Sequence, residues 1–227
     1  MSQNQFLPFL QALSDHNHKD WMDQNRNWYL EVKEDFLKDV THLLQNLTEL
    51  EPDMIHLRPK DCIFRQNRDV RFSPNKNPYK INLAAYFSVG GKKSAGPGYY
   101  LHIQPGESFL AGGIWMPDAE TLKRIRQEID YLGSDLINIL EEPDFKSTFD
   151  SLEGEQLKTS PRDYPADHPF IALLRYKSFI VSQPLSDEEI KSGKYKEKTL
   201  ASFKKMKPFQ DFLGRAIEEV EGGENIL

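Results

Sequence analysis

The densest group of chemically useful side chains lies between residues 65 and 80. This segment reads RQNRDVRFSPNKNPYK and contains five cationic residues and one anionic residue. Its local charge is +5 − 1 = +4, and because the whole chain has a net charge of −6, the remainder carries −6 − 4 = −10. Guanidinium and ammonium groups bind phosphate and carboxylate groups through charge-assisted hydrogen bonds. The segment is therefore predicted to bind an anion through Arg65, Arg68, Arg71, Lys76 and Lys80. The alternative is a solvated charged hairpin in which Asp69 pairs with a neighbouring arginine.

A second polar group lies in a proline-containing loop downstream. Lys158 and Arg162 add two cations there, and Asp167 and His168 follow them. We interpret Asp167 as the N-cap of a helix that runs through residues 173–174. His168 would then lie in the first helical turn, where the helix dipole disfavours an imidazolium, so a neutral His168 could act as a general base.

A third group is predicted on one face of a hairpin over residues 98–115. Alternation places Leu101 and Ile103 on one face and Tyr100 and His102 on the other. The chain turns at Pro105-Gly106, and a loop of two or four residues would place Tyr100 and His102 beside Glu107, Ala111, Gly113 and Trp115. A loop of three residues would reverse the partner strand. The histidine and the carboxylate could form an acid–base pair, two metal ligands or simply a cross-strand hydrogen bond.

Several short motifs do not support a known chemistry. The string GGKKS at 90–94 resembles a phosphate loop, but Tyr86 occupies the position of the required upstream glycine and Lys93 that of the Ser/Thr. His16-Asn17-His18 is interpreted as a polar helix cap. Cys62 is interpreted as an inert core residue in an apolar strand. No metal site is predicted, and the sequence does not indicate a cofactor.

The elements that must position these groups form three consecutive regions of one predicted domain spanning residues 1–227. Residues 1–50 are helical by their apolar spacing, residues 54–116 are rich in strands, and residues 117–227 are mostly helical. The predicted strands are 54–58, 61–66, 80–89, 98–104, 107–115 and 177–182. In the N-terminal region, helices are expected from about residue 6 and from about residue 28 to the stop at Glu51-Pro52-Asp53. A further helix should run from Pro117-Asp118 to an interruption at Gly133-Ser134. The last two helices should follow a Ser186–Glu189 capping box and start at Pro208, the latter with an apolar stripe that ends at Val220. The predicted fold class is α+β, with a mainly antiparallel central sheet and N- and C-terminal helices packed on it.

Composition excludes several broad classes. No apolar run reaches the roughly 18 residues that a membrane-spanning helix needs, and the N-terminus lacks the features of a signal peptide. The single cysteine excludes an internal disulfide and fits a reducing cytoplasm, so we expect a cytoplasmic protein without a membrane partner. The net charge of −6 argues against nucleic acid as a general partner. Nothing in the sequence indicates the oligomeric state.

Three strings together resemble one widespread family of bacterial and fungal proteins. They are FRQNRDVRFSPNKNPYKIN at 64–82, GYYLHIQPG at 98–106 running to GGIW at 112–115, and residues 157–169 from Leu157-Lys158 to Asp167-His168-Pro169. They resemble the conserved hypothetical family Domain of Unknown Function 2461, and the similarity extends over nearly the whole chain. The family pattern favours an acidic residue at position 104, where this chain has Gln104. The family implies no activity, but its motif blocks coincide with the three polar groups. A shared pocket would then comprise Arg65, Arg68, Asp69, Arg71, Lys76, Tyr79, Lys80, Tyr100, His102, Lys158, Arg162 and His168.

The leading hypothesis is a cytoplasmic pocket for a phosphorylated or carboxylated small molecule. Arg68, Arg71, Lys80 and Arg162 would hold the anion, and Tyr100 and His102 would be the proton-transfer groups if a reaction follows. Whether the protein is an enzyme is left open. One alternative is a non-catalytic module whose basic strip docks an acidic protein or nucleic acid. Another is a purely structural role for the arginines in buried ion pairs.

Overall fold

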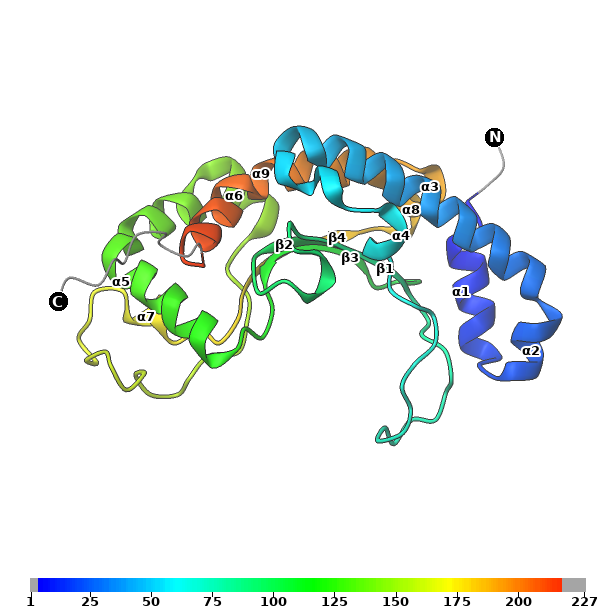
Figure 1. The fold of residues 1–227 in the computed structure, drawn as a ribbon, viewed down its shortest axis with the longest axis horizontal. Coiled ribbons are helices and arrows are strands. Elements are labelled where there is room, and N and C mark those ends of the chain that lie inside the picture. Colours follow the sequence, from blue (N-terminus) through cyan, green and yellow to red (C-terminus); the bar gives the residue numbers. More distant parts are fainter. Residues whose placement is uncertain (1–3, 218–227) are drawn as a thin grey trace. The chain divides into compact units, whose positions relative to one another are not determined.

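The computed structural model describes residues 4–217. It contains a four-stranded antiparallel sheet, with helices before the first strand and after the last one in the sequence (Figure 1). The strands are β1 (Leu83–Phe87), β2 (Gly98–Ile103), β3 (Ser108–Ile114) and β4 (Phe179–Leu185), and they lie in that order. The predicted α+β class with an antiparallel sheet is therefore confirmed. No described helix is long and apolar enough to cross a membrane.

The described helices lie before, between and after the strands. Before the sheet come α1 (Phe6–Asp15), α2 (Lys19–Gln24), α3 (Arg26–Leu50), the 3₁₀ helix η1 (Pro52–His56) and α4 (Pro59–Cys62). A short 3₁₀ helix, η2 (Gly91–Lys93), follows β1. Between β3 and β4 lie α5 (Ala119–Glu141), α6 (Pro143–Phe149) and α7 (Ile171–Leu174). After β4 come α8 (Asp187–Ser192) and α9 (Tyr195–Arg215).

Close contacts along the described chain define two compact units. The first lies within residues 1–94, 98–112 and 182–205, and the second within residues 95–97, 113–181 and 206–227. In the first unit one face of the sheet is fully buried, because Phe87 of β1 and Tyr99 of β2 pack against Phe203 of α9. The core of this unit therefore joins the sheet to a C-terminal helix, through a residue that precedes the predicted helix start at Pro208.

Two of the predicted strands are wrong. Residues 54–58 belong mostly to η1, and residues 61–66 begin in α4 and continue as irregular chain. Pro52 and Pro59 stand at the first helical positions of these two turns, where the fixed φ of proline favours helix initiation. Met54 and Cys62 therefore enter the core from helical turns, and of residues 54–66 only Ile63 forms a bridge, to Ala85 of β1.

Helix α5 begins and breaks close to where the sequence predicts. The Asp118 side chain caps it by accepting a hydrogen bond from the Thr121 amide at 2.8 Å. The backbone leaves helical geometry at Leu132, one residue before the predicted interruption, and the helix then resumes to Glu141. Gly133 follows the break, and a Cβ there would lie 2.5 Å from the Phe170 ring. The missing side chain lets the ring pack directly on the helix backbone.

Two further helix starts differ from the prediction. Asp167 does not cap α7, which starts at Ile171 after Phe170. Pro169 disfavours helical geometry at the residue before it, so His168 lies outside the helix. Helix α9 starts at Tyr195 and contains Pro208 in its interior. Its buried stripe continues across the proline, and this packing offsets the cost of the lost backbone hydrogen bond. Val220 of the predicted stripe lies outside the described residues.

Candidate functional site

The half-buried face of the sheet carries the Tyr100–His102 pair. The β1–β2 register places Ala84 opposite His102 and Tyr86 opposite Tyr100. Residues 104–107 form a four-residue connection between β2 and β3, which is one of the two loop lengths that the predicted register requires. In this register Phe109 of β3 lies next to the pair, and its ring stacks on the His102 imidazole with centroids 4.8 Å apart and planes at 17°.

The hydrogen bonds around His102 determine which of its nitrogens carries the proton. Nε2 lies 3.3 Å from the side-chain oxygen of Gln104, and the Gln104 amide nitrogen donates to the Glu107 carboxylate. Because the amide oxygen can only accept, His102 Nε2 carries the hydrogen. Nδ1 is therefore the acceptor, and the Tyr100 hydroxyl donates to it at 3.0 Å. The Asn82 amide approaches the same nitrogen at 3.4 Å.

Burial keeps both members of the pair uncharged near neutral pH. It lowers the pKa of His102, and the hydrogen bond that Nε2 donates to the Gln104 oxygen and the charge of Glu107 offset this only in part. Burial also raises the pKa of the Tyr100 phenol. A neutral imidazole that accepts a phenolic proton is the arrangement needed to pass a proton through the Tyr100 hydroxyl.

Phe64 connects this pair to a group of cations, which we call the cation cluster and define as Arg65, Lys80 and Lys92. The Phe64 ring contacts Tyr100 edge-on, with centroids 6.2 Å apart, and is 36% exposed. The ammonium nitrogens of Lys80 and Lys92 lie 5.2 and 5.3 Å from the Phe64 ring centroid. Each lysine therefore makes a cation–π contact with the same ring.

No carboxylate of the described residues pairs with the cation cluster. Within the described residues none of its three members forms an ion pair, and Lys92 donates only to the Ile63 carbonyl, at 2.6 Å. Partial burial, Arg65 and Lys92 together lower the pKa of Lys80. Because Lys80 and Lys92 contact the same ring, like charges lie close together here, and a bound anion would relieve their repulsion.

Residues 65–80 form an irregular hairpin, which we call the arm. It projects away from the strands beside α4 (Figure 1). Asn67 bridges to Tyr79, and the buried Gln66 side chain bonds to the backbone carbonyls of Lys80 and Asn82 at the base. Asn17 fastens the arm to the α1–α2 turn, because its amide group makes two hydrogen bonds, of 3.0 and 3.1 Å, with the Tyr79 backbone.

The other predicted ligands of the arm make local contacts. Arg71 forms a two-pronged pair with Asp69 at 2.7 and 3.0 Å, as the alternative of a charged hairpin predicts. Arg68 donates to the Asn77 carbonyl and the Ser73 hydroxyl, and Lys76 donates to the Val70 carbonyl. Of the predicted anion-binding residues in the arm, Lys80 and Arg65 thus belong to the cation cluster, whereas the other cations organise the arm itself.

The predicted site residues of the second unit lie in and after the 158–164 loop. Lys158 and Arg162 are exposed. His168 Nε2 lies 2.9 Å from the Asp130 carboxylate, and its Nδ1 accepts the Phe170 amide hydrogen at 3.1 Å. Both nitrogens are therefore engaged, and in this arrangement His168 joins the loop to α5. Whether these three residues meet the arm in one pocket stays a prediction.

The sequence did not reveal several members of the site. Lys92 lies in the GGKKS string, which does not match a phosphate loop. The motif comparison therefore did not indicate that this lysine alone contacts Phe64 in the site. Phe64 and Asn82 flank the arm, and Phe109 follows from the hairpin register once the loop length is known. Cys62 is buried, and burial raises the pKa of its thiol to about 11, which fits the predicted inert role. Among residues 4–217, no group of three acidic, histidine or cysteine side chains could hold a metal ion.

The comparisons define the class of protein to which this fold and site belong. The model of the family described as conserved hypothetical protein (DUF2461) matches residues 5–212. The chain therefore belongs to this family, as the three sequence strings indicate. Neither a curated protein nor a solved structure shows significant similarity to it.

Proposed function

We propose that this protein binds a phosphorylated or carboxylated small molecule at the cation cluster and exchanges a proton with it through Tyr100 and His102. The observation that carries the proposal is the convergence of Lys80 and Lys92 on Phe64 without an ion-pair partner among the described residues. Unpaired cations on a partly apolar platform favour a small anion with some apolar surface. The single cysteine agrees with a cytoplasmic metabolite as the ligand.

Tyr100 is the group that would meet the ligand. Its hydrogen points to His102 Nδ1, so the remaining lone pairs of its oxygen can accept a proton from a ligand hydroxyl or ammonium group. The phenolic hydrogen would then move to His102, and the resulting imidazolium would be stabilised through Gln104 by the Glu107 carboxylate. The reverse sequence would return the proton to the ligand. Phe109 keeps the imidazole plane in place for both directions.

A thermal-unfolding screen tests the anion site directly. Inorganic phosphate, pyrophosphate, citrate and a panel of phosphorylated and carboxylated metabolites are added to the wild-type protein. A ligand at 100 times its dissociation constant should raise the free energy of unfolding by about 2.7 kcal/mol. In the double variant Lys80→Gln/Lys92→Gln the stabilisation should disappear, because both ammonium groups at Phe64 are lost.

Lys93→Gln is the matched control, since Lys93 is an exposed neighbour in the same turn and carries the same charge. This variant should keep the wild-type stabilisation, and Tyr100→Phe should keep most of it because the cation cluster is intact. Equal stabilisation of the double variant and the control would locate the anion elsewhere. No stabilisation by any compound of the panel would contradict the proposal as a whole.

A further inference from the structure

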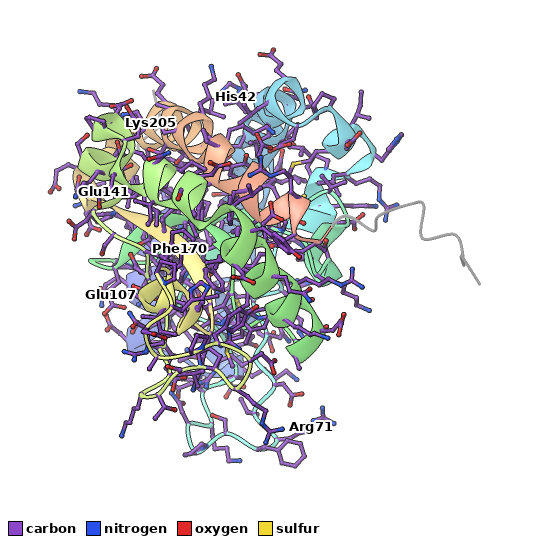
Figure 2. The ribbon with its side chains drawn as sticks, turned by 90° about the vertical axis from the view of Figure 1, so that its left-hand side faces the viewer. His42, Arg71, Glu107, Glu141, Phe170 and Lys205 are labelled. Atoms are coloured by element: carbon purple, nitrogen blue, oxygen red, sulfur yellow. The ribbon has the colours of Figure 1, made fainter. Side chains whose placement is uncertain are left out.

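The tip of the arm displays an aromatic side chain that the anion site does not use. Phe72 is 93% exposed, more than any other large apolar side chain of the described chain. The Arg71 guanidinium lies 5.7 Å from the centre of its ring. Figure 2 shows Arg71 at the far end of the arm, away from the strands. A phenylalanine held in water at the end of a projecting element is accessible to a partner, and burial of its ring there would be favourable.

The arm is built to hold this side chain in place. Arg68 ties its two halves together through the Asn77 carbonyl at 3.1 Å and the Ser73 hydroxyl at 3.3 Å. The Lys76 ammonium donates to the Val70 carbonyl at 3.1 Å, and the Asn75 side chain accepts the Asn77 amide hydrogen at 2.9 Å. Since these bonds already order the tip, little conformational entropy remains to be lost when it binds a partner.

We propose that the arm docks on a second copy of this chain. Charge complementarity indicates this partner, because the projecting part of the arm carries +3 − 1 = +2 from Arg68, Arg71, Lys76 and Asp69, whereas the chain outside residues 65–80 carries −10. Each copy therefore supplies both halves of an attractive pair. At physiological salt, charges act over about 8 Å, so the local contact decides the interaction rather than the net charge of −6.

A two-fold arrangement suits an element of this size. One phenylalanine and a few cations make a small interface. A two-fold axis would double the buried area, because the arm of each copy would contact the other copy. Each arm would cover its Phe72 ring against carboxylate-bearing surface of the partner copy. The association should therefore depend both on the aromatic ring and on salt.

Light scattering coupled to gel filtration tests this inference on the full chain. The monomer mass is 26.4 kDa. At low salt the wild-type mass should rise toward twice this value as the loading concentration increases from roughly 10 to 300 µM, and about 0.5 M NaCl should return it toward the monomer. Phe72→Ser should raise the dimer dissociation constant by about tenfold or more, because the ring that the partner covers is lost.

Ile55→Ser is the matched control, since Ile55 is a 70% exposed apolar residue of the same unit outside the arm. It should dimerise as the wild type does, and circular dichroism should show both variants folded. A wild-type protein that stays monomeric throughout would overturn the inference and leave the arm to a different acidic partner. A dimer that Phe72→Ser leaves unchanged would overturn it as well, because the interface would then lie elsewhere. Either result would leave the proposed anion site untouched.

Discussion

At the scale of single residues, the neighbours of His102 determine its chemistry. The oriented amide of Gln104 fixes the hydrogen on Nε2, the Tyr100 hydroxyl occupies Nδ1, and the Phe109 ring covers one face. Gln104 is itself neutral, but its amide donates to the Glu107 carboxylate. The negative charge that would stabilise an imidazolium therefore lies one side chain further away.

The lowered pKa of His102 predicts how stability changes with pH. An unfolded histidine has a pKa of about 6.5, so below this pH the unfolded chain takes up a proton more readily than the folded one. The contribution of His102 is therefore fully present above about pH 6.5 and decreases as the pH falls toward the lower folded pKa. Urea unfolding at pH 7.5 and 5 should show a smaller loss of stability in His102→Asn than in the wild type. An equal loss in both proteins would contradict the assignment.

The sequence alone predicted the residues of this site that depend on local patterns, but not those that depend on tertiary contacts. The alternation of β2 predicted correctly that Tyr100 and His102 share the half-buried face. The roles of Phe64 and Lys92 depend on chain segments that meet only in the folded protein, so no spacing rule could indicate them. The ion pair between Arg71 and Asp69 is local in sequence, and the alternative of a charged hairpin predicts it.

At the scale of elements, the strand β3 depends on a glycine. Gly113 has a φ of +121°, and a Cβ at this position would lie 2.0 Å from the Phe179 carbonyl oxygen of β4. The two strand segments of the second unit can therefore approach each other only when position 113 has no side chain.

Replacing this glycine should be costly. Gly113→Ala adds a methyl group against a backbone atom and also strains the backbone, so the free energy of unfolding should fall by about 3 kcal/mol or more. Gly214→Ala is the control, because a Cβ at this position of α9 meets nothing within 4 Å. It should leave stability unchanged or raise it by up to about 1 kcal/mol. Chemical denaturation measures both, and a tolerated Gly113→Ala would show that β3 can move away from β4.

Prolines explain most of the errors at this scale. Pro52 and Pro59 start helical turns inside a stretch whose apolar residues resemble strands, and Pro169 excludes His168 from α7. Pro208 has the opposite effect, since tertiary packing carries α9 through it. Local propensity is a weak guide wherever buried contacts outweigh it. The Ser186–Glu189 capping box was predicted correctly because its two hydrogen bonds are entirely local.

At the scale of the whole molecule, a buried hydrogen bond joins sequence-distant helices of the first unit. The Tyr195 hydroxyl at the start of α9 donates to the Asp39 carboxylate of α3, and the Lys196 ammonium reaches the same carboxylate at 3.0 Å. Tyr195 is fully buried, and burial together with Asp39 raises its pKa well above the usual value. The phenol therefore stays protonated and acts as a permanent donor.

Removal of that hydroxyl should weaken the fold. Tyr195→Phe leaves the partly buried Asp39 carboxylate one hydrogen bond short, so the free energy of unfolding should decrease by about 1–3 kcal/mol. Tyr131→Phe makes the same change at a side chain that is 84% exposed and should have no measurable effect. Equal stabilities of these two variants in denaturant titrations would show that the bond contributes nothing net.

The link between Asn17 and the arm has a consequence for the ageing of the protein. Spontaneous deamidation of an asparagine replaces its amide nitrogen by a negatively charged oxygen. At Asn17 this oxygen would face the Tyr79 carbonyl, which now accepts a hydrogen bond from the amide nitrogen at 3.0 Å, and attraction would become repulsion. A slow chemical change of one residue would thus loosen the arm at its base. The attachment of the arm would then be weaker in an old preparation than in a fresh one made from the same gene.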